Sequence, residues 1–198
     1  MKKLFEAFCT AAVTDVQKEP AETEESQMAA VRKINENGEY VFESRIFGGE
    51  IEISADDGVS EDYVRRCAED LESMPDTVMQ AIFEGAKRYC LWFIEIEKDA
   101  MGDSFAVTEK YHEVTLNTPA ADMRPLFCIF CMNIETPEDE SILAYSIGAG
   151  CDWEPEHGID VLIKDRKVIY VGACEGYSPW DTEYFCEGEG TEWNFALE

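Results

Sequence analysis

Residues 126–132 have the sequence Leu-Phe-Cys-Ile-Phe-Cys-Met, and this stretch decides the fold. A strand that is apolar at every position has to be covered on both faces, so the stretch predicts a central strand of a β-sheet. Within it, Cys128 and Cys131 have the spacing of a metal or redox pair. Positions three apart on a regular strand point to opposite faces, so we expect the two sulfur atoms to diverge and both cysteines to belong to the core.

The neighbouring strands are predicted from alternating side chains and from turn residues. Residues 39–54 alternate between apolar and charged side chains around Gly48-Gly49, which is typical of a β-hairpin. Asp165-Arg166 suits a two-residue turn between two short apolar runs. The remaining strands are predicted at residues 107–116, 142–147, 159–163 and 168–171.

Two helices are expected in the middle of the chain. Ser60 has the side chain of a helix N-cap, and the two acidic residues that follow it suit the positive end of a helix. Pro75 ends this helix and begins the next one. The predicted fold class is therefore α+β, an antiparallel sheet with two central helices, at about residues 60–72 and 76–95, packed on one face.

Residues 1–38 are expected to form an N-terminal helical and acidic segment, and residues 39–198 a single α+β domain. Apolar side chains recur at helical spacing in the N-terminal segment, the second time at Met28, Val31 and Ile34. Asn37-Gly38 suits a left-handed helix cap, but it also suits a tight hairpin turn with a strand on either side. We favour the helix.

Acidic residues outnumber basic residues by 43 to 16, and the formal net charge is -27. This charge repels the phosphates of nucleic acid and an anionic membrane surface, so neither is expected as a partner. The charged partners that we expect are cations: a basic protein surface, a polyamine or metal ions. The imbalance is greatest from Pro125 onward, where sixteen acids accompany three bases, Lys164, Arg166 and Lys167.

The eight cysteines are scattered along the chain, and most of them lie inside apolar runs. A cysteine in such a place behaves as a small apolar side chain, so we expect reduced cysteines and a cytoplasmic location. No run approaches the roughly 20 apolar residues that a membrane helix needs.

One loop gathers residues that carry chemistry. A functional interpretation makes His157 a general base or a metal ligand, with Glu154 or Glu156 as its partner. A structural interpretation makes Trp153 part of the core, lets His157 bond a backbone group and gives Gly158 a left-handed conformation, and we favour it. The candidate binding residues are Asp152, Trp153, Glu154, Glu156 and His157.

The segment Trp153-x-x-Glu156-His157-Gly158, followed by a strand, a turn and the strand at residues 168–172, resembles a bacterial domain family of unknown function. The hairpin at residues 47–53 and the helical middle of the chain extend this resemblance to residues 39–175. Such domains are similar to immunity proteins that neutralise the toxin of a neighbouring cell. The resemblance implies no catalytic residues.

Two functions are compatible with these features. The favoured one is a non-enzymatic acidic binding protein, for example an immunity protein that blocks a basic toxin surface, with Trp153, Trp180 and Trp193 as contact residues and without a cofactor or metal. The alternative is a metal-dependent hydrolase centred on His157 with Glu154 and Glu156, to which His112 is an additional ligand.

Overall fold

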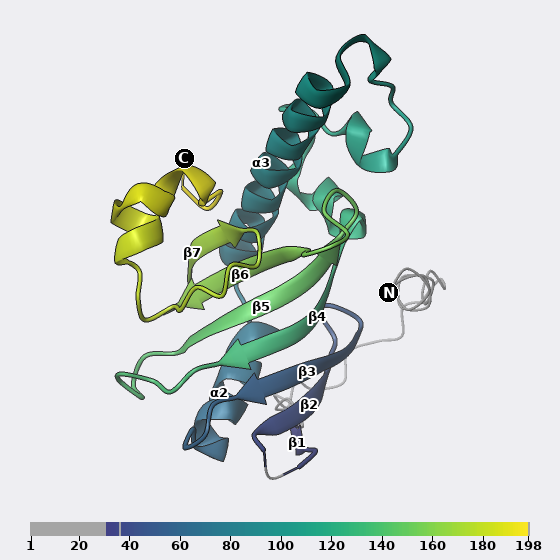
Figure 1. Ribbon diagram of the computed structural model, residues 1–198. Coiled ribbons are helices and arrows are strands. Elements are labelled where there is room, and N and C mark those ends of the chain that lie inside the picture. The colour runs from purple at the N-terminus through teal and green to yellow at the C-terminus, as the bar shows by residue number, and fades with distance from the viewer. Residues whose placement is uncertain (1–30, 36, 198) are drawn as a thin grey trace, which may run out of the picture.

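The fold is organised by one seven-stranded β-sheet whose strands lie side by side in chain order (Figure 1). The computed structural model describes residues 31–35 and 37–197. Most of the stretch at residues 126–132 lies in β4, the middle strand of the sheet, as predicted. The strands are β1 (Arg32–Lys33), β2 (Glu39–Ser44), β3 (Gly49–Ala55), β4 (Phe127–Ile134), β5 (Ala144–Cys151), β6 (Ile159–Lys164) and β7 (Lys167–Gly172).

Neighbouring strands are antiparallel except for β3 and β4, which are parallel and place Glu52 opposite Cys131. The prediction of an entirely antiparallel sheet is wrong at this pair. The chain between β3 and β4 contains both long helices, and a connection of that length can return the chain to the end of the sheet where β3 began. The protein is therefore an α+β protein with a mostly antiparallel sheet.

The two α-helices begin where the sequence predicts. The Ser60 hydroxyl accepts a hydrogen bond from the Tyr63 amide at 3.1 Å and caps the first helix. The second helix follows Pro75 and continues well beyond residue 95. The helices are α2 (Glu61–Glu72), α3 (Asp76–Met101), the short 3-10 helices η1 (Gly102–Ser104), η2 (Lys110–Glu113), η3 (Ala120–Leu126) and η5 (Glu189–Trp193), and the π-helical turn η4 (Glu183–Glu187).

The helix predicted from Met28, Val31 and Ile34 is wrong over the described residues. Arg32 and Lys33 instead form β1, which pairs with β2 across a turn, as in the hairpin alternative. Gly38 in this turn has a φ of 79°, and a Cβ atom there would lie 2.3 Å from the Ala55 carbonyl oxygen, so the position requires glycine. Met28 and the earlier helical pattern lie outside the described residues.

The strand predicted at residues 107–116 is also wrong, because this segment contains the 3-10 helix η2. Tyr111 and Val114 are both buried there. Their spacing of three residues places them on one side of a 3-10 turn, so the apolar pattern that suggested a strand is satisfied by a single helical turn.

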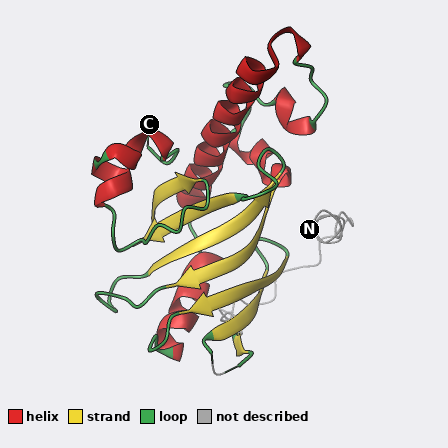
Figure 2. Cartoon of the chain, viewed as in Figure 1, coloured by secondary structure: helices red, strands yellow, loops and turns green. Residues whose placement is uncertain are grey.

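One face of the sheet, the helix face, packs against α2 and α3 in a single apolar core (Figure 2). Gly85 of α3 allows close approach to β7, because a Cβ atom there would lie 2.7 Å from Cγ2 of Val171. Tyr63 of α2 reaches the start of β5, where its hydroxyl donates to the Ile142 carbonyl at 2.8 Å and accepts from the Ala144 amide at 3.1 Å. Burial of apolar surface at this interface is the main favourable contribution to folding.

The opposite face, the open face, is covered over only part of its width. Leu162 and Tyr170 form a second apolar cluster with Phe185, which belongs to the C-terminal segment (residues 173–197). On the β3 side of the same face, Glu50 and Glu52 are exposed. The C-terminal segment therefore covers β6 and β7 and leaves the β3 side in contact with solvent.

Asn194 holds the C-terminal segment against the edge of β7. Its Oδ1 accepts a hydrogen bond from the Val171 amide at 3.3 Å, and its Nδ2 donates to the carbonyls of Ile169 at 2.8 Å and Phe185 at 3.0 Å. The Phe195 amide adds a bond to the Val171 carbonyl at 2.8 Å. These bonds satisfy backbone groups on an edge strand that would otherwise be open to a further strand.

Replacing Asn194 by alanine should lower the free energy of unfolding by about 2 to 3 kcal/mol, because buried backbone groups of Val171, Ile169 and Phe185 lose their partner. Urea denaturation followed by tryptophan fluorescence measures the change. Asn117→Ala, in an exposed loop, is the matched control and should change stability by less than about 0.5 kcal/mol. Equal effects of the two substitutions would contradict this role of Asn194.

Candidate functional site

The loop between β5 and β6 is built around a buried tryptophan. Trp153 is 1% exposed. Its ring makes edge contacts with Tyr89 of α3, at 6.1 Å between centroids, and with Phe127 of β4, at 6.5 Å. Tyr89 in turn stacks on Phe195 of the C-terminal segment at 5.0 Å. Trp153 therefore belongs to the core, as the structural interpretation predicted, and is not available as a surface contact.

The acidic residues of this loop shape its backbone. Glu154 Oε1 accepts hydrogen bonds from the amides of Glu156 at 3.0 Å and His157 at 3.3 Å. The His157 ring is exposed, and its Nδ1 lies 3.6 Å from the same Glu154 oxygen. Asp152 is also exposed at the surface. Neighbouring protein atoms nevertheless remove part of the water around its carboxyl group, and this desolvation raises its pKa. The loop brings Glu154 and His157 together at the surface rather than in a cleft.

His112, the other histidine, has a structural role. Its Nδ1 accepts hydrogen bonds from the amides of Thr108 and Glu109, both at 3.2 Å. Its Nε2 therefore carries the proton and donates to Glu97 of α3 at 3.0 Å. The Nε2 atom thus holds η2 against α3, the Nδ1 atom fixes the backbone just before η2, and 7% of the side chain is exposed. The prediction that His112 lies on a surface strand is wrong.

The arrangement of these side chains does not favour a metal-dependent hydrolase centred on His157. Within the described part of the chain, no group of three or more histidine, cysteine, aspartate or glutamate side chains is placed to hold a metal ion. The two histidines also differ in environment, because His157 is exposed and His112 is enclosed.

Gly158 ends the loop and is required by its backbone. Its φ is 73°, and a Cβ atom would lie 2.3 Å from the Ala149 carbonyl oxygen on β5. The Gly158 amide also donates to the Glu154 carbonyl at 2.9 Å. The glycine of the Glu-His-Gly sequence is thus explained by a tight return from β5 into β6.

Gly158→Ala should lower the free energy of unfolding by more than about 3 kcal/mol, because the strained φ is combined with a collision against backbone. Gly176 is a matched control, since it has the same φ of 73° but no atom within 4 Å of the added Cβ. Gly176→Ala should cost about 1 kcal/mol. Chemical denaturation of both variants compares the two losses, and similar losses would show that the close contact with Ala149 is unimportant.

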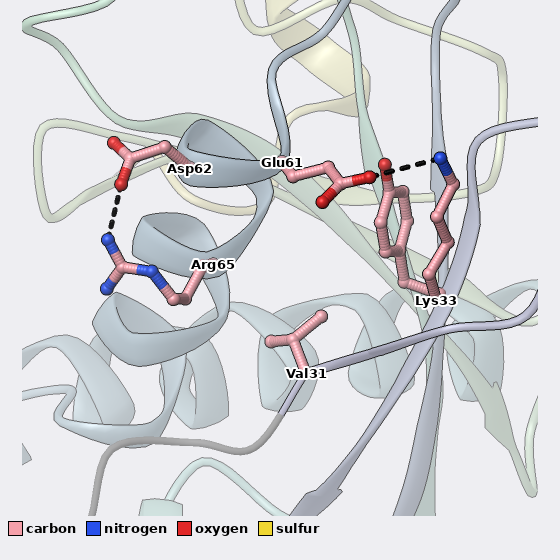
Figure 3. Close-up of a pocket in the computed structure, with 6 residues that line it drawn as sticks. Val31, Lys33, Glu61, Asp62 and Arg65 are labelled. Carbon is pink, nitrogen blue, oxygen red and sulfur yellow. Dashed lines mark hydrogen bonds and ion pairs between the residues drawn. The ribbon is translucent and has the colours of Figure 1, made fainter.

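A hollow of about 320 Å³ opens between β1 and α2 (Figure 3). Lys33 lies on one side and donates to Glu61 Oε1 of α2 at 3.1 Å. Arg65 of α2 pairs with Asp62, one turn away on the same helix. Acidic and basic side chains alternate around this hollow, so it does not concentrate charge of either sign.

On the open face, one oxygen atom of a buried carboxyl group has no hydrogen-bond partner among the described residues. Asp160 of β6 is 5% exposed, and its Oδ1 has no hydrogen-bond partner among the described residues. Its cross-strand neighbours are Gly148 on β5 and Gly172 on β7, neither of which has a side chain to offer. A buried polar atom without a partner is costly, and it needs an explanation beyond folding.

Two thiols lie near this carboxyl group. The Sγ atom of Cys131 in β4 lies 2.6 Å from the position that a Cβ atom would take if one were added to Gly148. The sulfur therefore lies above that glycine. Cys174 follows β7 and is exposed. Electrostatic coupling with Asp160 raises the pKa of both thiols, although burial contributes more in each case. We define the Asp160 site as Asp160, Cys131, Cys174, Gly148 and Gly172.

The position of Cys131 corrects a sequence prediction. Cys128 lies opposite Gly150 and Cys131 opposite Gly148, with a β-bulge between Ile129 and Cys131. Because Gly148 and Gly150 are two residues apart on β5, both cysteines face the same side of the sheet. The predicted divergence of the sulfur atoms is wrong, because the bulge adds one residue to β4 and so turns Cys131 to the same face of the sheet as Cys128.

Burial raises the pKa of the Asp160 carboxyl to about 7, and the Val161 amide opposes this shift. The group therefore changes charge in the neutral pH range. Sequence reasoning missed Asp160, although one signal was present: an acidic residue directly after Ile159 in an otherwise apolar strand. The absence of a partner depends on the two glycines opposite, which only the strand register reveals.

A family model described as a domain of unknown function, DUF6985, matches residues 32–178. The chain belongs to the DUF6985 family. The match includes the whole sheet and therefore Asp160, but most of the C-terminal segment lies beyond it. No curated protein and no solved structure showed a match. None of the described helices has the length and apolar character needed to span a membrane.

Asp160→Asn should stabilise the protein in a pH-dependent manner. The folded-state pKa of Asp160, about 7, lies above the usual aspartate value of 3.8, so wild-type stability declines as pH rises from about 4 to about 7. The asparagine variant lacks this decline and should be more stable at pH 8 by up to about 4 kcal/mol. Urea denaturation at several pH values measures the difference.

Asp165→Asn is the control for this experiment, because Asp165 is exposed at the end of the same strand. It should show no comparable pH-dependent gain. A loss of stability in Asp160→Asn at every pH would mean that the carboxyl group has a partner.

Proposed function

We propose that this chain is a non-enzymatic binding protein that covers a basic surface of a partner protein. The observation that supports this proposal is an excess of exposed carboxylates without neighbouring bases. Of the three basic residues after residue 124, Arg166 donates to the buried Asp70 carboxylate at 2.6 Å, and Lys164 lies 4.4 Å from the centroid of the Trp180 ring. Among the residues that the structure describes, most exposed acids after residue 124 form no ion pair with a lysine or arginine.

The C-terminal segment presents the densest part of this surface. Tyr184 is 48% exposed and Trp193 is 42% exposed, and aromatic side chains of this kind are frequent in the energetically important parts of interfaces. No basic residue follows Lys167 in the sequence. The exposed acids of the segment are Glu175, Asp181, Glu183, Glu187, Glu189 and Glu192.

The position of this surface suggests how the chain would recognise one particular partner. The acids and aromatics from residue 179 onward lie outside the family match, whereas the sheet that supports them lies inside it. Of the three tryptophans expected as contacts, Trp193 is 42% exposed with its ring against Trp92, Trp180 is half-buried beside Lys164, and Trp153 is in the core. Within this proposal, residues 179–197 supply specificity and the sheet supplies the common fold.

An acidic surface accelerates encounter with a basic partner and competes with anions for the same site. This behaviour suits an immunity protein that blocks a toxin, a role also suggested by the sequence resemblance. We further propose a bacterial, cytoplasmic protein, in which the described cysteines stay reduced.

Binding to a basic probe should depend strongly on salt. A short rhodamine-labelled peptide rich in lysine and arginine is titrated with the protein, and fluorescence anisotropy gives the dissociation constant. The affinity should fall more than tenfold between about 0.05 M and about 0.5 M NaCl, since screening weakens interactions between exposed charges.

The location of the charges is tested with two triple variants of equal net charge. Glu183→Gln, Glu187→Gln and Glu189→Gln together should weaken binding much more than Glu43→Gln, Glu50→Gln and Glu52→Gln together, which alter exposed residues of β2 and β3. If the peptide does not bind the wild-type protein at low salt, the proposed function fails. If the two variants behave alike, the C-terminal segment is not the binding surface.

A further inference from the structure

We propose that Asp160 is the receptor for one lysine or arginine side chain of the basic partner, which enters the open face across Gly148. This inference rests on the proposed function and specifies the contact within it. It assigns a role to the one buried carboxylate oxygen that lacks a hydrogen-bond partner among the described residues.

The register of the sheet provides the space for such a side chain. Asp160 lies between Gly148 and Gly172, so neither of its cross-strand neighbours has a side chain of its own, and only the Cys131 sulfur lies within 4 Å of a Cβ position on Gly148. Gly148 and Gly150 are half-buried, which places them at the boundary between the covered and the solvent-exposed parts of the open face. On Gly172 the Tyr170 hydroxyl lies 2.5 Å and the Trp193 carbonyl oxygen 2.7 Å from a Cβ position, so Tyr170 and the C-terminal segment block that approach. The accessible approach is from β5.

Few atoms need to move for a side chain to reach the carboxyl group by this approach. The Sγ atom of Cys131 is the atom nearest to a Cβ position on Gly148, and Cys131 is half-buried. A cysteine side chain changes rotamer without moving backbone. The segment above Asp160 also contains Cys174 and Gly176, both exposed, and Gly176 has a φ of 73° with open space around it.

Charge determines which ligand fits. A buried carboxylate without a partner is unfavourable, and a cation that pairs with it gains an interaction that water screens only weakly. The protein as a whole attracts cations, since its formal net charge is -27. An anionic or apolar ligand would leave Asp160 unpaired. A lysine or arginine side chain supplies both the charge and a narrow apolar stem.

Binding should then require the ionised form of Asp160. The titratable groups around it are Cys131 from β4, Tyr170 from β7, and Cys174 with Glu175 from the C-terminal segment. Burial raises the pKa of Cys131 to about 11 and also raises the pKa values of Cys174 and Tyr170, so these three groups stay neutral between pH 6 and pH 8. Asp160 itself changes charge in this range.

The test measures binding of the rhodamine-labelled basic peptide at pH 6 and pH 8, at one ionic strength, for three proteins. For the wild-type protein the affinity should rise nearly tenfold from pH 6 to pH 8, because the ionised fraction of a group with a pKa of about 7 rises by that factor. Asp160→Asn should bind more weakly at pH 8 and lose most of this rise. Asp165→Asn removes the same charge from an exposed position and should behave as wild type.

The possible outcomes distinguish a failure of the Asp160 contact from a failure of the proposed function. Any other group that changes charge between pH 6 and pH 8 is present in both the wild-type protein and Asp160→Asn, so the difference between the two isolates Asp160. If Asp160→Asn binds the peptide as wild type does at both pH values, Asp160 is not the receptor, while the acidic surface remains a binding surface. If the wild-type protein does not bind at either pH, the proposed function itself is wrong. Circular dichroism confirms that each variant is folded.

Discussion

The structure depends on the need to cover the apolar side chains that line the helix face of the sheet and the β6–β7 part of its open face. Helices α2 and α3 cover the helix face, and Gly85 allows α3 to lie directly against Val171 of β7. On the open face the C-terminal segment covers β6 and β7 through Phe185, and Asn194 fixes it to the strand edge. This cover ends near β5, and the arrangement at that boundary gives the molecule its most unusual feature.

At the boundary, Asp160 is buried enough to lose solvent but lies between two glycines that cannot replace the lost hydrogen bonds. A sequence selected for stability alone would place an apolar or amide side chain there. Natural proteins retain destabilising groups chiefly at functional sites. The same reasoning assigns no function to the loop at residues 151–158, where Trp153, Glu154 and Gly158 each have a structural reason.

Much of the fold follows from local sequence signals, and the errors have specific causes. Ser60 and Pro75 mark helix starts, and Asp165-Arg166 forms the predicted turn with φ values of 50° and 57°. A two-residue strand such as β1 is too short to produce an alternating pattern in the sequence. Its pairing with β2 shows that Asn37-Gly38 belongs to a hairpin turn and not to a helix cap. The bulge beside Cys131 and the glycines opposite Asp160 involve residues distant in sequence, so the Asp160 site could not be predicted from local pattern.

The proposed role of Asp160 depends on the charge of its carboxyl group, and that charge can be observed directly. Carbon-detected NMR of the side-chain carboxyl groups, followed from pH 4 to pH 9 and assigned with Asp160→Asn, gives the pKa of Asp160 in the free protein. A titration midpoint near 7 is the predicted result. A midpoint near 4, as for an exposed aspartate, would show that the carboxylate has a partner or free access to solvent, and the receptor role would have no physical basis.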